Sequence, residues 1–329
     1  MNTPLVSVNC LVFNHARYLR VCLDSLLMQR TNFPYEVVVH DDASTDGSSD
    51  ILREYATRYP DVVRPYIQAE NQHSKGRKYI GEDVNVQRSR GRYIAFCEGD
   101  DFWTDPQKLQ RQFDAMEAHP ACSICFHHTR VVDENGQPGM GAFPIPGTRL
   151  EGLERVSIYD LLRSHCRDGL CSFQTSSFFI RKEYMEEYVR LKQTVYKAFP
   201  YGDTPMAITA LMHGEGLVLR SEMSAYRTCP TGFTAVRYDN RKQRLQMEKE
   251  ESEGYRALDA YTKGIYHRLI RYKLLRNELN AASGFGSDLL VQFRPKYWRL
   301  LPTRPLRWNL SELRRGLKQK LHPKRSEDK

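Results

Sequence analysis

Residues 91–101 read Gly-Arg-Tyr-Ile-Ala-Phe-Cys-Glu-Gly-Asp-Asp, an apolar run that ends in four residues of which three are acidic. The run 93–97 has the composition of a buried strand, so Glu98, Asp100 and Asp101 stand where the strand leaves the sheet. Carboxylates this close repel one another and hold a proton between them unless a cation neutralises them. A divalent metal ion is therefore the expected partner, and it suggests a substrate that carries phosphate.

A second acidic strand end lies upstream. Residues 35–40, Tyr-Glu-Val-Val-Val-His, run into 41–47, Asp-Asp-Ala-Ser-Thr-Asp-Gly. In open α/β sheets, ligands bind in the crevice beyond the carboxyl ends of the strands, so two acidic strand ends would face one site. Taken alone, 41–47 also has the composition of an ordinary turn followed by a helix cap. The presence of both clusters favours a site.

The composition indicates a globular protein with one large α/β domain and an appendage, or with two small domains. The hydrophobic fraction is 40% and the charged fraction 27% of 329 residues, and no apolar run has the length of a membrane span. The apolar run 5–13 reads as a strand rather than as a signal peptide. Eight irregularly spaced cysteines do not resemble a disulfide framework, so a reducing cytoplasm is expected.

Strands and helices alternate along the chain, which predicts a largely parallel sheet with right-handed crossovers. Residues 133–152 are rich in glycine and proline and predict an irregular loop long enough to cover a site. The expected strands are 5–13, 36–40, 62–68, 93–97, 122–128, 173–180 and 217–220, and the expected helices are 16–29, 48–59, 81–90, 203–212 and one that opens at 104–106.

A change in composition near residues 235–245 predicts a catalytic domain at 1–240 and a helical, basic extension at 241–329. Residues 240–329 contain 22 Lys and Arg against 10 Asp and Glu, so the net charge of +9 resides in this part of the chain.

The motifs of the first 235 or so residues, in their order, resemble the nucleotide-sugar glycosyltransferases of family 2, which have the GT-A fold. Residues 6–14 resemble the opening strand and the turn under the nucleotide base, and 41–47 resemble the D-D-x-S-x-D-G segment. Residues 91–101 resemble the glycine-led strand before the D-x-D signature, spelled here Glu-Gly-Asp. The resemblance implies a Rossmann-like, mainly parallel sheet flanked by helices.

The resemblance also implies which residues meet the donor. Asp41 is implied to hold the base, usually uracil, and Asp100 to bind Mn²⁺ or Mg²⁺ with Asp101 or Glu98. Glu98 stands where a first aspartate is usual, so a ribose hydroxyl or a metal-bound water is its implied partner. The residues implied on the donor side are Phe13, Asn14, Asp41, Asp42, Glu98, Asp100 and Arg227.

Transfer of a sugar from a diphosphate needs a group that removes the proton of the acceptor hydroxyl. Asp203, in Tyr-Gly-Asp-Thr-Pro, resembles the base of the family, and inversion at the anomeric centre is the implied outcome. Alternatively, Asp203 only caps the helix that begins at Thr204. Arg227 is implied to contact phosphate, with a structural ion pair as the alternative. Trp103 is expected to stack on a sugar or the acceptor, or else to pack in the core.

The resemblance therefore implies a metal-dependent hexosyl- or N-acetylhexosaminyltransferase. It would move a sugar from a nucleotide, expected to be UDP, to a glycan or lipid-linked acceptor in bacterial capsule, lipopolysaccharide or exopolysaccharide synthesis. The basic, leucine-rich stretch 294–325 suits an anionic membrane surface, with packing on its own domain as the alternative. The expected location is the cytoplasm, at the inner face of the membrane.

Three other functions agree less well with the sequence. An acidic crevice would repel a nucleic-acid backbone, although the pI is 9.1. A nucleotidyltransferase would have a glycine- and lysine-rich loop after the first strand, where residues 9–14 read Asn-Cys-Leu-Val-Phe-Asn. A catalytically inactive scaffold would bind a nucleotide sugar without turnover, and the carboxylates at 41, 100 and 203 argue against it.

Overall fold

The computed structural model describes residues 3–77, 80–168, 173–229 and 240–283, together with 294, 295 and 297. It divides into two compact units, each described by itself. Unit 1 contains Met1–Leu161, Cys171–Lys197 and Tyr201–Val236; unit 2 contains Leu162–Leu170, Ala198–Pro200 and Arg237–Lys329. The basic stretch 294–325 lies almost entirely outside the described residues.

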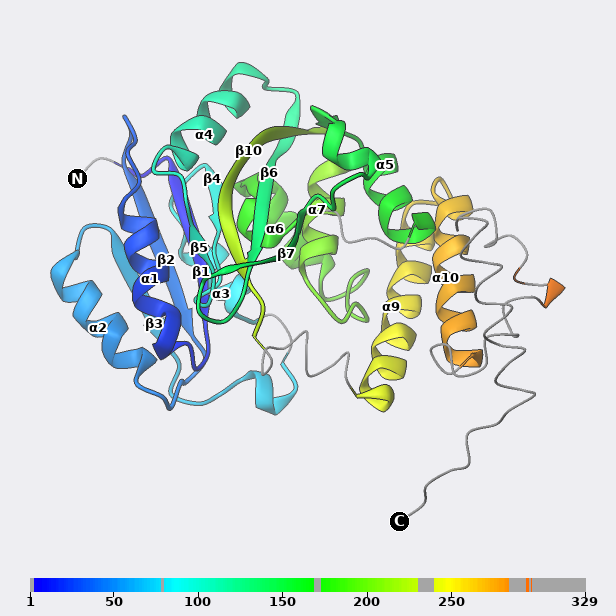
Figure 1. Ribbon diagram of the computed structural model, residues 1–329, viewed down its shortest axis with the longest axis horizontal. Coiled ribbons are helices and arrows are strands. Elements are labelled where there is room, and N and C mark those ends of the chain that lie inside the picture. The colour runs from blue at the N-terminus through cyan, green and yellow to red at the C-terminus, as the bar shows by residue number, and fades with distance from the viewer. Residues whose placement is uncertain are drawn as a thin grey trace, which may run out of the picture. The chain divides into compact units, whose positions relative to one another are not determined.

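Unit 1 is built on one mixed sheet, in which β1, β2, β3 and β4 form a parallel core (Figure 1). The strand order is β3-β2-β1-β4-β9-β6-β10-β5, with β7 on β6 and β8 on β10. The α/β class with a GT-A type of sheet is confirmed. The bounds are β1 Val6–Val12, β2 Tyr35–Asp41, β3 Val63–Ile67, β4 Tyr93–Phe96, β5 Phe102–Trp103, β6 Cys122–Val132, β7 Pro138–Phe143, β8 Arg155–Val156, β9 Phe179–Arg181 and β10 Glu215–Arg227.

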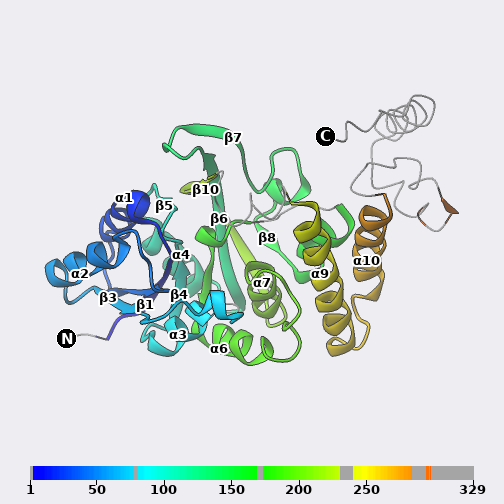
Figure 2. The same cartoon turned by 90° about the horizontal axis from the view of Figure 1, so that it is seen from below.

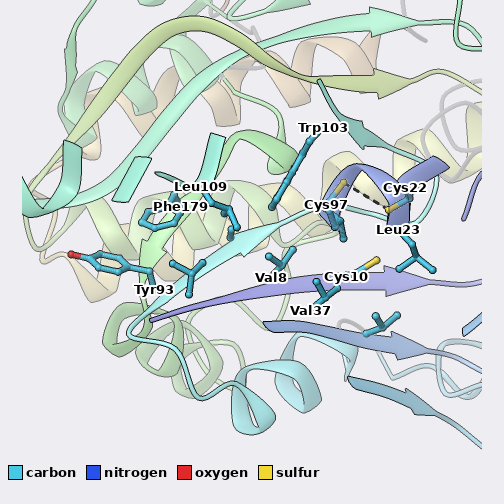
Figure 3. Close-up of a cluster of buried hydrophobic side chains, with 14 of the residues drawn as sticks. Val8, Cys10, Cys22, Leu23, Val37, Tyr93, Cys97, Trp103, Leu109 and Phe179 are labelled. Atoms are coloured by element: carbon cyan, nitrogen blue, oxygen red, sulfur yellow. Dashed lines mark hydrogen bonds between the residues drawn. The ribbon is translucent and has the colours of Figure 1, made fainter. Parts of the chain in front are cut away.

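Strand β1 shows why the two faces of the sheet differ. Side chains alternate along a strand, so Val8 and Cys10 join the main apolar cluster, whereas Ser7 and Asn9 face the other side. Figure 3 shows Val8 and Cys10 beside Leu23 in this cluster. The apolar face thus carries the core, and the opposite face carries buried polar contacts.

Helices cover both faces of the sheet. Leu19, Leu52 and Leu109 of α1, α2 and α4 belong to the apolar cluster, whereas Asn85 of α3 binds Asn9 on the opposite face. Figure 2 shows α3, α6 and α7 grouped on one side of the sheet. The bounds are α1 Ala16–Leu27, α2 Ser48–Arg58, α3 Ile80–Arg88, α4 Lys108–Ala118, α5 Ile158–Leu162, α6 Lys182–Leu191 and α7 Asp203–Leu211.

Three expectations are corrected. Residues 133–152 are not an irregular loop, because they contain β7 and the 3₁₀ turn Arg149–Gly152. The hairpin turn is made by Asp133, whose carboxylate accepts the N–H groups of Asn135 and Gln137, and Gly136 takes the positive φ of +80°. The strand expected at 173–180 is confined to β9. Helix α4 begins at Lys108 without a side-chain cap from Thr104.

Unit 2 contains the helices α9 (Arg241–Tyr261) and α10 (His267–Ala282). The side chain of Asn240 caps α9 by accepting two backbone N–H groups. Lys273 pairs with Glu251 at 2.9 Å, and the Asn277 amide donates to the same carboxylate. Among the helices of the described residues, none combines the length and apolarity needed to cross a membrane.

Asn85 fixes α3 to the sheet, because its buried amide donates to Asn9 Oδ1 and to the carbonyls of Cys10 and Val38. Asn85→Ala leaves these acceptors buried without that donor, so we expect the free energy of unfolding to fall by about 3 kcal/mol. Urea unfolding measures this change. Gln87→Ala, on the exposed face of the same helix, should change it by less than about 0.5 kcal/mol. Equal losses in both variants would contradict the anchoring role.

Candidate active site

The strand ends of the parallel core bring the two acidic segments to one edge of the sheet. The register pairs Val12 of β1 with Asp41 of β2, and the Gly99 N–H donates to the carbonyl of Leu11 at 2.8 Å. Asp100 then lies beside the first turn, where its carboxylate is 3.9 Å from His15 Nε2. The expectation that both clusters lie at one edge is thus realised in space.

The turns after β1 and β2 are locked to each other. Asn14 donates its backbone N–H to Ser44 Oγ and accepts the Thr45 N–H through its side chain, both at 2.8 Å. Asp46 accepts the Ala16 N–H at 2.8 Å. Phe13 stays 47% exposed in the first turn, so its ring is available to a planar ligand.

Asp41 and Asp42 hold loops, and their expected contacts with the donor stay predictions. Asp41 is fully buried and accepts from the backbone and hydroxyl of Ser44 and from the Ser49 hydroxyl. Asp42 is 8% exposed and accepts the N–H groups of Gln72 and His73 at 2.8 and 3.0 Å. Their carboxylate oxygens accept hydrogen bonds from neighbouring loops and are buried from solvent.

Negative charge accumulates around Glu98. Burial, followed by the charges of the nearby carboxylates of Asp100, Asp203 and Glu82, raises the pKa of Glu98 to about 8. Asp203 comes from the start of α7 and Glu82 from the start of α3. The fold thus brings together acids that are far apart in the sequence, and a cation would relieve their repulsion.

Asp101 is buried in the protein, and its expected role as a metal ligand stays a prediction. It is 2% exposed, and its carboxylate accepts the backbone N–H of Arg227 at 2.8 Å. Burial, with the charges of Asp100 and Glu98, holds the pKa of Asp101 well above its usual range. Asp101 thus joins the end of β10 to the segment 98–101, which we call the acidic loop.

Arg227 holds the acidic loop in position through backbone carbonyls. Its guanidinium donates to the carbonyls of Asp100, Asp133 and Glu134 at 2.8, 3.3 and 3.0 Å. The side chain also lies over the ring of Tyr18, 4.6 Å from its centroid. These acceptors are backbone carbonyls, and the implied phosphate contact and its alternative of an ion pair stay predictions.

Asp203 is the first residue of α7, and its carboxylate accepts the N–H of Thr204 at 2.6 Å. It is half-buried, and its charge reaches Glu98. Asp203 therefore both contacts the first turn of α7 and lies close enough to Glu98 to affect its pKa.

Trp103 belongs to the core, which corrects the expected stacking on a sugar. Its ring is 1% exposed, and its indole N–H donates to the carbonyl of Phe96 at 3.3 Å. The ammonium of the buried Lys108 lies 4.0 Å from the ring centroid and donates to Gln112. Figure 3 shows Trp103 within the apolar cluster.

Two contributors to the site were missed from the sequence. His15 lies beside Asp100, and its only signal was its place directly after the Phe-Asn pair of the first turn. The hairpin turn at Asp133 and Glu134 receives Arg227. Its signal was the Asn-Gly pair at 135–136, which is typical of tight turns.

The donor set suits a hard cation only in part. Glu98 and Asp100 supply carboxylate oxygens, which Mg²⁺ and Mn²⁺ accept. No group of three or more His, Cys, Asp or Glu side chains among the described residues is arranged to hold a metal ion. A cation here would need ligands from elsewhere, and phosphate oxygens are such ligands.

The family model described as glycosyl transferase family 2 matches residues 7–189, which include both acidic strand ends. The chain belongs to glycosyl transferase family 2. An uncharacterized protein of Mycobacterium tuberculosis is 42% identical over 135 residues, which are 40% of this chain and 37% of that protein. TuaG of Bacillus subtilis, named provisionally as a teichuronic acid biosynthesis glycosyltransferase, is 30% identical over 41% of this chain and 50% of its own length. The matches thus span half or less of these relatives.

Solved structures of two transferases share the fold across nearly the whole chain. TarS of Staphylococcus aureus, in complex with UDP-GlcNAc, has a TM-score of 0.56 and 15% identity, over 96% of this chain and 91% of that one. The mannosyltransferase PcManGT of Pyrobaculum calidifontis, in complex with GDP-Man and Mn²⁺, has a TM-score of 0.55 and 16% identity, over 99% and 89%. At this identity the likeness establishes the GT-A fold.

Arg227→Met removes the donors that join the acidic loop to the hairpin turn. We expect amide hydrogen exchange in peptides covering 98–102 and 133–137 to become about tenfold faster, because their local opening costs less free energy. Exchange mass spectrometry measures this change. Arg130→Met breaks only the exposed pair with Glu222 on the same two strands and serves as the control. Unchanged exchange in Arg227→Met would contradict the positioning role.

Lys108 predicts a pH dependence of stability. Burial lowers its pKa to about 7, so between about pH 7 and 10.5 the unfolded chain binds a proton that the folded chain does not. The penalty of burying the charge is complete below pH 7 and is relieved as the pH rises. We expect unfolding free energies at pH 7.5 and 9.5 to show a contribution of about 1 kcal/mol per pH unit that is lost in Lys108→Met. Parallel pH profiles of the two proteins would contradict it.

Proposed function

We propose that this family 2 enzyme transfers a hexose or N-acetylhexosamine from UDP to a hydroxyl of a glycan or lipid-linked acceptor, with inversion. The observation that carries the proposal is the convergence of Glu98, Asp100 and Asp203 at the carboxyl edge of the sheet. A diphosphate leaving group and an acceptor proton are the two charges that such a site must handle. Half-buried carboxylates from two different elements can handle these two charges separately.

Asp100 and Glu98 would hold a divalent cation, Mn²⁺ or Mg²⁺, between the protein and the diphosphate. When bound, the cation would act as a Lewis acid that neutralises the leaving oxygens. The raised pKa of Glu98 fits this assignment, because negative charge at this place is costly without a counterion. Arg227 would keep the acidic loop in place through the carbonyl of Asp100.

Asp203 would serve as the general base. It would accept the proton of the acceptor hydroxyl while that oxygen bonds to the anomeric carbon and the bond to the diphosphate oxygen breaks. One displacement inverts the anomeric centre. The helix terminus at Asp203 supports the charged form of the carboxylate, because its Oδ1 already accepts the Thr204 N–H.

The donor and acceptor classes rest on the relatives. UDP is preferred because TarS is seen with UDP-GlcNAc, although PcManGT is seen with GDP-Man. The exposed ring of Phe13, with Asn14 beside it, would meet the base. The name of TuaG supports a surface polysaccharide as the product.

Two substitutions separate donor binding from proton transfer. We expect UDP binding that depends on Mn²⁺, measured by calorimetry, to be lost in Asp100→Ala. Asp203→Asn should bind UDP within about twofold of the wild type but lower kcat by about 100-fold or more, because only the base is removed. Release of UDP with a polysaccharide acceptor fraction measures turnover.

Asp114→Asn provides the control, since Asp114 is an exposed carboxylate on α4 whose hydrogen-bond partner among the described residues is Gln110. It should match the wild type in both assays. No UDP binding by the wild type would overturn the UDP assignment, and full turnover in Asp203→Asn would overturn the base.

A further inference from the structure

Glu82 is a buried carboxylate with one oxygen atom that lacks a hydrogen-bond partner among the described residues. It stands in the first turn of α3 and is 6% exposed, and its Oε2 atom has no hydrogen-bond partner. Its neighbour Asp83, by contrast, is paired with the ammonium of Lys192. A buried acceptor that stays unsatisfied costs free energy, so it calls for a partner from outside the chain.

The direction of α3 places Glu82 at the carboxyl edge of the sheet. A Cβ atom added at Gly81 would meet the side chains of Leu11 and His40, near the ends of β1 and β2. At the other end of the helix, Arg88 donates to the carbonyls of Arg64 and Pro65 near the start of β3. Helix α3 therefore begins where the strands end.

The side chain of Glu82 also lies on the face of α3 that meets the sheet. Residues three apart occupy the same face of a helix. Asn85, three residues later, is bonded to Asn9, Cys10 and Val38. Glu82 is thus one turn closer than Asn85 to the acidic edge.

Electrostatics link Glu82 to the candidate active site. Its charge is among those that raise the pKa of Glu98, and burial raises the pKa of Glu82 itself, although Lys192 opposes this. No three acids of the described part are placed to share one metal ion, and Glu82 is therefore considered as a hydrogen-bond acceptor. Glu82 thus supplies a buried hydrogen-bond acceptor whose charge reaches Glu98.

We propose that Glu82 binds hydroxyl groups of the nucleotide sugar and thereby contributes to the choice of donor. The inference rests on the proposed function and adds a residue to it. An ionised carboxylate only accepts hydrogen bonds, and the hydroxyls of a sugar ring are the donors that a nucleotide sugar offers. A bond to a charged acceptor in a buried place is stronger than one between neutral groups.

Two rings of a nucleotide sugar have hydroxyl groups, the ribose and the transferred sugar. The transferred sugar is favoured, because the carboxylates that act on Glu98 together with Glu82 include Asp203, the proposed base at the anomeric carbon. The ribose hydroxyls are the alternative partners of Glu82, and the binding experiment distinguishes them from the hydroxyls of the transferred sugar.

The experiment measures binding of three probes by calorimetry, with Mn²⁺ and without acceptor. The probes are UDP, 2′-deoxy-UDP and whichever of UDP-glucose, UDP-galactose and UDP-GlcNAc the wild type binds best. Glu82→Gln keeps the shape of the side chain but removes its charge. If Glu82 binds the transferred sugar, only the affinity for the UDP-sugar falls, by about tenfold. If it binds the ribose, the affinity for UDP falls and that for 2′-deoxy-UDP does not.

Asp83→Asn is the matched control, one residue along the same helix turn. It leaves the buried Lys192 without its carboxylate partner, so the melting temperature should fall while the affinities, measured below it, stay within about twofold. Glu82→Gln should melt no lower than the wild type, because it removes a buried, repelled charge.

Unchanged affinity for all three probes in Glu82→Gln would overturn the inference, and the proposed function would stand. The inference would also be overturned if Glu82→Gln lost stability as Asp83→Asn does and kept its affinities. No UDP binding by the wild type would overturn the proposed UDP donor and this inference together.

Discussion

Carboxylates that repel one another are held close together at the carboxyl edge of the parallel core, and the surrounding residues of unit 1 must hold them there. Glu98, Asp100 and Asp203 reach this edge from two separate elements, and burial makes their charge more costly. Backbone hydrogen bonds of neighbouring segments hold the loop that carries Glu98 and Asp100. Arg227 bonds the carbonyl of Asp100, not its carboxylate, so the backbone is fixed and the charge is retained.

The acids of this edge fall into two groups according to their hydrogen bonds. One group, Asp41, Asp42 and Asp46, accepts hydrogen bonds from backbone N–H groups and hydroxyls of neighbouring loops. These carboxylates therefore stabilise the turns. The carboxylates of Asp100 and Glu98 accept no such hydrogen bond among the described residues. A site that binds a cation and a diphosphate needs both groups of acids. One group holds the surrounding loops in place, and the other is available to the ligand.

The order of strands and helices was predictable, because apolar residues with period 2 or 3.6 depend mainly on local burial. The helices at 16–29, 48–59 and 203–212 were found within two residues of α1, α2 and α7. The hairpin containing β7 was missed, because its glycines and prolines hid the turn at Asp133. Helix α6 was not expected either. Pairing between β6 and β10 joins residues about 90 positions apart, and no local pattern encodes it.

The sequence by itself determined the fold class, the family and the carboxylates at 98, 100 and 203, because strand ends, motif order and residue chemistry are properties of short segments. Only the tertiary structure decided how deeply the side chains near them are buried and which partners they contact. It buried Trp103 and Asp101, turned Arg227 toward carbonyls, and brought Glu82 beside Glu98. Burial and long-range charge depend on packing between segments distant in the chain, so a side chain's chemistry alone does not reveal its partner.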